Sequence, residues 1–141
     1  MKQILLITIG LSVALWADFS RDDSTQIVTD STTGLQWQDN AIGNTMPWED
    51  AIAYCKALEI DTHSDWRLPN INELKTIIDR GKVFPAIVDG FTNTSSNYYY
   101  WSSSTYEGRK GNAWRVYFYS GRTFSYYKDT SYYVRCVRVG Q

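Results

Sequence analysis

The chain has 141 residues and a formal net charge of −1, which suits one domain and argues against a strongly basic nucleic-acid binder. The charge is divided, because residues 18–96 carry 6 basic and 13 acidic side chains and residues 97–141 carry 7 basic and 2 acidic ones. Ten of the eleven tyrosines also lie in residues 97–141. This basic, tyrosine-rich region predicts a surface for an anionic or sugar-like partner, although tyrosines packed across strands with solvated arginines would give the same composition.

Residues 1–17 have the pattern of a secretory signal peptide. Lys2 precedes an apolar run from Ile4 to Trp16, and the small residue Ala17 suits a cleavage site. The run is short for a transmembrane helix, so we expect export without stable membrane insertion, with an uncleaved N-terminal anchor as the alternative. The protein is then expected in the periplasm, at the cell surface or outside the cell.

A β-hairpin is predicted over residues 27–30 and 35–38. Two short β-rich runs flank a polar turn that ends in Gly34. Alternation of apolar and polar residues places Leu35 and Trp37 on the buried face. Residues 18–26 form an N-terminal segment before this hairpin, and we assign residues 27–139 to a single domain.

A first helix is predicted from Trp48 to Leu58. Pro47 suits a first helical turn, where no N–H donor is needed, and Glu49 and Asp50 suit the positive end of the helix dipole. Apolar residues recur on one face at helical spacing, and Cys55 is among them. We therefore expect Cys55 to point into the core.

A second helix follows an extended segment over residues 66–69, since a residue before proline avoids the helical region. Asn70 is expected to cap this helix, with Glu73 as the reciprocal partner in a capping box. The predicted apolar stripe is Ile71, Leu74, Ile77 and Ile78. Gly81 is expected to end the helix.

The remainder of the chain predicts an irregular stretch and then an antiparallel sheet. The stretch covers residues 82–97, and the strand candidates are 98–105, 114–119, 122–127 and 132–139. A hairpin, two helices, a long loop and a sheet in this order indicate the α+β class.

The two cysteines, Cys55 and Cys136, are most simply a structural disulfide in an exported chain. The alternative is a catalytic or metal-binding thiol pair. It lacks a CxxC spacing, and the only histidine, His63, has no ligand cluster beside it. Leu68 offers neither carboxylate nor amide for a calcium-dependent sugar site of the lectin type, so we expect no metal and no cofactor.

Four segments of the chain together resemble a known bacterial family. They are Asp65–Asn70 followed by Glu73-Leu74, and residues 33–37, 100–104 and 133–138. The order and content resemble the domain named for the C-terminal domain of the Legionella collagen-like adhesin, the Lcl C-terminal domain, over about residues 27–139. The residues counted as its structural hallmark are Trp37, Trp48, Trp66, Arg67, Pro69, Asn70, Glu73, Trp101 and Trp114.

The resemblance implies a C-type-lectin-like fold, in the version shared with formylglycine-generating enzymes. It also implies a disulfide from the first helix to the last strand, the positions of Cys55 and Cys136. The adhesin that names the family is associated with binding sulfated glycosaminoglycans and with trimer formation. This chain has no collagen-like Gly-X-Y stalk, so trimerisation through such a stalk is not implied.

We expect a non-enzymatic recognition domain that binds glycans, including anionic ones, through the basic, tyrosine-rich sheet. Sugar rings stack on aromatic rings, and sulfate or carboxylate groups pair with arginine. The candidate ligand-binding residues are Arg109, Lys110, Arg115, Tyr117, Tyr119 and Arg122. Arg115, Tyr117 and Tyr119 would lie on the outer face of the strand at 114–119 if Trp114, Val116 and Phe118 faced the core.

Two other functions remain open. One is a structural or protein-binding module, with an envelope or host surface protein as partner. The other is a remote enzyme of the formylglycine-generating type, which would need the cysteines as free thiols. A serine nucleophile among residues 102–104 would lack a general base unless His63 approached it.

Overall fold

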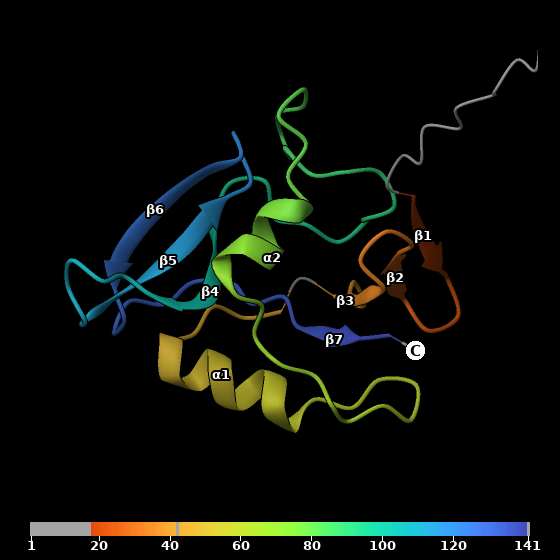
Figure 1. Cartoon of the computed structure of the whole chain (residues 1–141), viewed down its shortest axis with the longest axis horizontal. Coiled ribbons are helices and arrows are strands. Elements are labelled where there is room, and N and C mark those ends of the chain that lie inside the picture. The colour runs from red at the N-terminus through yellow and green to blue at the C-terminus, as the bar shows by residue number, and fades with distance from the viewer. Residues whose placement is uncertain (1–17, 42, 141) are drawn as a thin grey trace, which may run out of the picture.

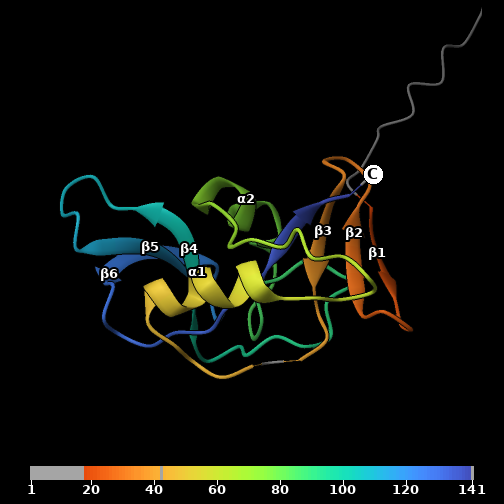
Figure 2. The ribbon, with the colours of Figure 1, turned by 90° about the horizontal axis from the view of Figure 1, so that it is seen from below.

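Two antiparallel sheets and two short helices build the predicted α+β fold (Figure 1). The computed structural model describes residues 18–41 and 43–140, so the predicted signal peptide lies outside the described residues. The two sheets lie toward opposite ends of the molecule, with α2 between them, and α1 runs along one side (Figures 1 and 2). Within the described ranges, no helix has the length and hydrophobicity that crossing a membrane requires.

The first sheet contains the predicted hairpin and has the strand order β1-β2-β3-β7. Its members are β1 (Phe19–Asp22), β2 (Ile27–Asp30), β3 (Leu35–Gln38) and β7 (Val137–Val139). Leu35 and Trp37 are buried, which confirms their expected face. The turn before β3 closes at Gly34, whose φ of 73° is a left-handed conformation that glycine adopts without strain.

Strand β1 was not expected from the sequence. It pairs antiparallel with β2 along its full length, so part of the N-terminal segment 18–26 belongs to the sheet. Phe19 packs against the core, and its ring centroid lies 6.3 Å from that of Phe91. Its four residues contain one apolar side chain, Phe19, so the sequence pattern is too short to predict a strand.

The predicted last strand, 132–139, differs most from the structure. Only β7 is a strand, and it pairs with β3 in the first sheet rather than with the C-terminal sheet. Tyr132 and Tyr133 instead form isolated bridges with Met46 and Tyr100. The backbone groups of these tyrosines are therefore satisfied by two different segments before the chain reaches β7.

Helix α1 (Trp48–Ala57) matches its prediction closely. Pro47 occupies the N-cap position, one residue before the first turn in which it was expected, and Glu49 and Asp50 follow in that turn. Ala51 and Cys55 are fully buried on the apolar face. They belong to a core cluster that also contains Trp66, Trp101 and Cys136.

Helix α2 (Ile71–Thr76) has the predicted capping box but is shorter than predicted. Asn70 Oδ1 accepts the Glu73 N–H at 2.8 Å, and the Glu73 carboxylate accepts the Asn70 N–H at 2.9 Å. The helix ends at Thr76 because the Ile77 carbonyl accepts the Val88 N–H and Ile78 bridges Ile87. Tertiary pairing thus replaces the expected last helical turn.

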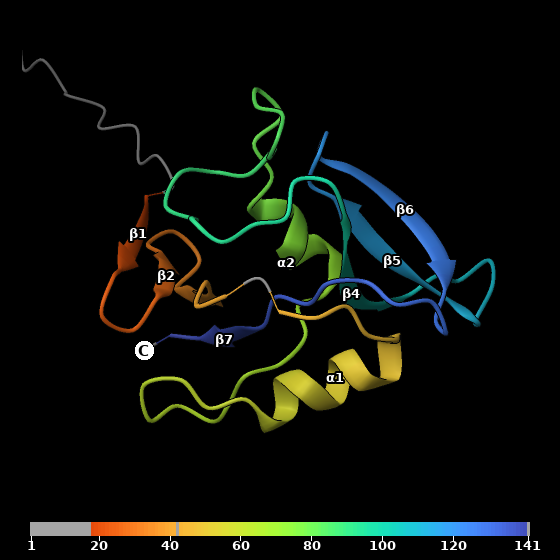
Figure 3. The same cartoon turned by 180° about the vertical axis from the view of Figure 1, so that it is seen from behind.

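The second sheet has the order β4-β5-β6. Its strands are β4 (Tyr99–Thr105), β5 (Asn112–Tyr117) and β6 (Arg122–Tyr127), and β6 is its outer strand (Figure 3). Gly121 closes the β5–β6 turn with a φ of 75°. Tyr100, Val116 and Phe118 face a core shared with α2 and the first sheet, whereas Trp101 and Ala113 face the cluster around α1.

Candidate functional site

The candidate site is the side of the second sheet that carries Arg115. Residues directly opposite each other in neighbouring strands project to the same side of a sheet, and Arg115 on β5 lies opposite Phe124 on β6. The register places seven further side chains on this side, and two of them, Trp101 and Ala113, are buried in the core cluster around α1. We name as the tyrosine face the surface made of Tyr99, Arg115, Tyr117, Arg122, Phe124 and Tyr126.

Arg115 lies beneath aromatic rings rather than in solvent. Its side chain is on the side of β5 opposite Val116, as expected, but the residue is only 7% exposed. The guanidinium carbon lies 3.6 Å from the ring centroid of Tyr99, 4.4 Å from that of Tyr132 and 4.6 Å from that of Tyr126. The expected solvent-exposed arginine is therefore the centre of a tyrosine cage.

The cage gives Arg115 no acidic partner. Among the described residues, Arg115 takes part in no ion pair, and its Nε is buried without a hydrogen-bond acceptor. Attraction to ring faces stabilises a cation by about 2 kcal/mol or more where water is excluded. Burial raises the pKa of the Tyr132 hydroxyl, and the Arg115 charge opposes that rise.

A row of stacked rings extends from the cage. The Tyr99 and Tyr117 centroids lie 4.5 Å apart with planes at 21°, and those of Tyr117 and Tyr119 lie 5.5 Å apart with planes at 8°. Phe84 then meets Tyr119 edge-on at 3.9 Å. These side chains come from β4, from β5 and its following turn, and from the irregular stretch 82–97, so folding alone creates a continuous aromatic strip.

The outer strand keeps the tyrosine face open to solvent. Phe124 and Tyr126 on β6 are both exposed on this side, although large apolar rings are usually covered. Arg122 is exposed at the end of β6 where it lies opposite Tyr117. A ligand could thus reach both the rings and a free cation on this side.

Arg109 and Lys110 lie apart from that cation, in the turn between β4 and β5. Arg109 donates a hydrogen bond of 2.7 Å to the Tyr127 hydroxyl and lies 5.4 Å from the centre of that ring. Both residues are exposed. Arg122 lies opposite Tyr117 at the far end of β5, so positive charge brackets the sheet at its two ends.

The six predicted ligand residues therefore divide into two groups. Arg115, Tyr117 and Arg122 lie on the tyrosine face, and Tyr119 continues its row of rings. Arg109 and Lys110 form a separate basic turn. Three aromatic members of the tyrosine face, Tyr99, Phe124 and Tyr126, were not among the predicted residues, and neither was Tyr132 of the cage. Alternation along 122–127 would have placed Phe124 and Tyr126 on the same side as Arg122. The side on which Tyr99 lies could not be predicted, because residues 98–100 are three consecutive tyrosines.

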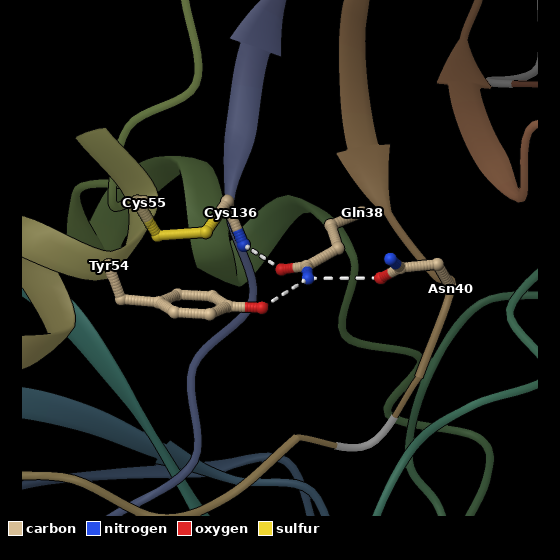
Figure 4. Close-up of a disulfide and its surroundings, with 5 residues drawn as sticks. All are labelled: Gln38, Asn40, Tyr54, Cys55 and Cys136. Carbon is tan, nitrogen blue, oxygen red and sulfur yellow. Dashed lines mark hydrogen bonds between the residues drawn. A yellow bond between two sulfur atoms is a disulfide. The ribbon is translucent and has the colours of Figure 1, made fainter. Parts of the chain in front are cut away.

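The Cys55–Cys136 disulfide is present, which confirms the structural reading of the two cysteines. Figure 4 shows it joining α1 to the residue that enters β7. Beside it, Gln38 Oε1 accepts the Cys136 N–H at 3.1 Å, and Gln38 Nε2 donates to Asn40 and to the Tyr54 hydroxyl at 3.0 Å each (Figure 4). Both cysteine sulfur atoms are therefore in the disulfide, which is surrounded by hydrogen-bonded side chains.

The hallmark tryptophans hold the core together. Trp37 and Trp101 are fully buried, and Trp66 is nearly so. Trp101 donates its indole N–H to the Met46 carbonyl at 3.0 Å, and Trp48 donates to the Ser102 carbonyl at 2.8 Å. These bonds fix β4 against α1 and the segment before it. Trp114 is only half-buried, and it meets Tyr106 edge-on at 5.2 Å.

The rest of the hallmark orders the entry to α2. Arg67 forms two parallel hydrogen bonds of 2.7 Å with the Glu73 carboxylate. This guanidinium, more than any other group, holds the pKa of Glu73 below its usual range. Pro69 is buried and its carbonyl accepts the Ser103 N–H at 2.8 Å. The segment from Arg67 to Glu73 thereby serves folding.

The described residues offer little for metal or nucleophilic chemistry. Within 18–41 and 43–140, no three His, Cys, Asp or Glu side chains gather where a metal ion could be held. The Ser102 hydroxyl is buried and donates to the Trp114 carbonyl at 2.7 Å. His63 pairs through its backbone with Ile60.

Comparison with known proteins places the chain in a family. The family model of the Lcl C-terminal domain matches residues 26–138. No curated protein matches the chain. The match covers most of the chain, including both helices, both cysteines and every strand except β1 and the last residue of β7. The chain belongs to the Lcl C-terminal domain family.

Proposed function

We propose that the domain is a non-enzymatic recognition module that binds anionic glycans on the tyrosine face. The observation that supports this most is Arg115, a buried cation with no acidic partner among the described residues. A charge removed from water is unfavourable unless paired, so the site gains stability when a sulfate or carboxylate approaches. A planar guanidinium also offers such groups two parallel donors.

The aromatic strip supports the sugar part of the proposal. Tyrosine rings combine an apolar face with a hydroxyl, which matches the mixed character of a sugar ring. Tyr99, Tyr117 and Tyr119 are already stacked in a row, so ordering them would not oppose binding. Arg122 and the basic turn at Arg109 would attract a longer anionic chain from either end.

Heparin retention tests the proposal. The wild-type protein should be retained at low salt and released at moderate ionic strength, because contacts with charged groups weaken as salt screens them. The double variant Arg115→Met, Arg122→Ala should elute early, since it removes both cations of the tyrosine face and keeps the bulk of the buried side chain. Near-UV circular dichroism should show that it folds.

The matched control is Lys75→Ala, Arg80→Ala. Both residues are exposed, lie on or just after α2, and carry the same two charges. Retention should survive in this variant. Failure of folded wild-type protein to bind heparin at low salt would sink the proposal, and equal loss in the control would show that net charge rather than the tyrosine face is responsible.

Protein binding through the same region is the second candidate. Val83 and Phe84 are 61% and 57% exposed, and Phe84 meets Tyr119 at the end of the aromatic strip. Aromatic and arginine side chains dominate protein interfaces, so an envelope or host surface protein would fit this strip. Binding that persists in high salt and is lost in Phe84→Ser would favour that partner over a glycan.

We further propose that the fold is C-type-lectin-like and that the protein works outside the cytoplasm. The first and last parts of the domain share one sheet, and the disulfide joins the first helix to the entry of the last strand. A disulfide persists where the environment is oxidising. Detection of the cleaved chain in a periplasmic or culture-supernatant fraction would test the location.

A further inference from the structure

A hollow of about 450 Å³ lies between α1, β4 and the segment 66–70, and no residue of the tyrosine face lines it. Its apolar lining comes from Ile52, Trp66 and Leu68. Volumes of this size are typical of sites for small organic molecules. Neither the core packing of the hallmark segment nor the proposed glycan site uses this space.

The walls of the hollow are held in place before any ligand arrives. The disulfide ties α1 to Cys136, and the next residue, Val137, exchanges two backbone hydrogen bonds with Arg67 at 2.8 and 2.9 Å. Trp66 is fixed by its indole N–H, which donates to the His63 carbonyl at 3.1 Å. Two walls are therefore anchored to consecutive residues of one strand entry, and a ligand need not order them.

The rim of the hollow is polar and positive. Lys56 lies one helical turn after Ile52 on α1, is exposed, and forms no ion pair within the described residues. The Asn70 amide and the Ser103 hydroxyl also line the hollow, and neither donates a hydrogen bond to a described residue. No carboxylate among the described residues lines the hollow, and Arg67, which also lines it, is engaged by the Glu73 carboxylate.

We propose that this hollow binds a small carboxylate with an apolar body, an acyl or aryl carboxylate in chemical terms. The apolar body would cover Trp66 and Leu68, and the carboxylate would lie at the rim beside Lys56, with Asn70 and Ser103 as further donors. An apolar floor with one uncompensated cation at its edge favours this class over a neutral or cationic amphiphile. The site is independent of the tyrosine face.

Octanoate and octylamine form a matched pair of probes, with equal chains and opposite charges. In a ¹⁵N-resolved NMR titration, octanoate should shift the Trp66 indole and the Ser103 and Lys56 amides in a saturable way, and octylamine should not. Lys56→Ala should weaken octanoate binding about fivefold, the effect of one exposed ion pair. Ser103→Phe should fill the hollow and abolish binding.

Lys75→Ala removes an equivalent exposed charge on α2, outside the hollow, and should bind octanoate as the wild type does. Arg115→Met should do the same, which separates this site from the glycan site. The proposal is overturned if octanoate shifts only tyrosine-face resonances, if octylamine binds equally well, or if folded protein shows no saturable shift with octanoate.

Discussion

Arg135 and Arg115 are both buried, but the protein accommodates their charges in different ways. Arg135, beside the first sheet, is 3% exposed, and it donates to the Asp39 carboxylate, to the carbonyls of Gln38 and Asn93, and to the Thr94 hydroxyl. Arg115, in the second sheet, is 7% exposed, and among the described residues its guanidinium lies over the rings of three tyrosines. Both guanidinium groups lie over aromatic rings, and both have a buried Nε without an acceptor, so the difference lies in the acceptors of the terminal nitrogens.

Arg135 is held in a network of hydrogen bonds around Asp39, whereas Arg115 is not. Asp39 is fully buried and also accepts the Arg21 side chain and the backbone N–H groups of Thr92 and Asn93. This node joins β1 and β3 to the irregular stretch and to the segment before β7. Removing any member leaves others unpaired. Arg115 has no such network among the described residues, and under the proposed function its donors would serve a ligand.

Breaking the Asp39 node should have the largest effect on stability. Asp39→Ala leaves Arg135 and Arg21 without their carboxylate and should lower the free energy of unfolding by about 3–5 kcal/mol. Urea denaturation followed by tryptophan fluorescence measures the change. Asp129→Ala, at an exposed acid in the turn after β6, is the control and should be nearly neutral. A small loss in Asp39→Ala would mean that the node is not the anchor inferred here.

Acid should lower the free energy of unfolding by protonating the Asp39 carboxylate. Burial would raise the pKa of Asp39, but the Thr92 N–H, the Arg135 charge and the Arg21 hydrogen bond together hold it below its usual range. The unfolded chain therefore binds the proton more tightly, so this stability is fully present above the ordinary aspartate pKa of about 4 and is lost as pH falls through the lowered folded value. Unfolding free energies between pH 6 and pH 3 should fall less steeply in Asp39→Ala, and parallel curves would contradict the assignment.

Replacing Arg115 should cost much less stability than breaking the node. Arg115→Met removes ring contacts worth about 1–2 kcal/mol but also removes a buried charge, so the net loss should be below about 2 kcal/mol. Arg135→Met, which removes one of the two cations paired with the buried Asp39 carboxylate, is the comparison and should lose clearly more. Equal losses in the two variants, measured by urea denaturation, would erase the distinction between the two arginines.

An ion pair with an exposed carboxylate should have the smallest effect. Arg138 donates to the Asp65 carboxylate at 2.6 Å, but the Asp65 side chain is 60% exposed. Asp65→Asn should lower the free energy of unfolding by only about 0.5–1 kcal/mol, and the loss should shrink in high salt. Denaturation at two salt concentrations checks this. If Asp65→Asn lowered the free energy of unfolding as much as Asp39→Ala, the exposure of a carboxylate would not determine how much its ion pairs stabilise the fold.

Local signals in the sequence predicted much of this fold. The capping box of Asn70 and Glu73, the hairpin that ends at Gly34 and the disulfide each depend on residues whose chemistry acts at short range or on a single possible pairing. The position of β7 could not be predicted, because pairing with β3 joins residues about a hundred positions apart and alternation does not name a partner.

The candidate site was predicted in part for the same reason. Alternation along β5 placed Arg115 and Tyr117 together, and β6 followed as the returning strand. The burial of Arg115 depends on Tyr132, which arrives from a segment expected to be a strand of the same sheet. A sequence pattern gives the side of a strand on which a residue lies, but tertiary packing decides what covers that side.

Both ends of the described chain meet at one turn. The Asp18 carbonyl accepts the Ser31 N–H at 3.0 Å, and the Gly140 N–H donates to the Gly34 carbonyl at 2.9 Å, so entry and exit lie on the turn between β2 and β3. The second sheet projects from the opposite end of the molecule (Figure 1). A short linker across this turn should allow circular permutation, and a scaffold attached there would display the aromatic strip at the far pole without obstructing it.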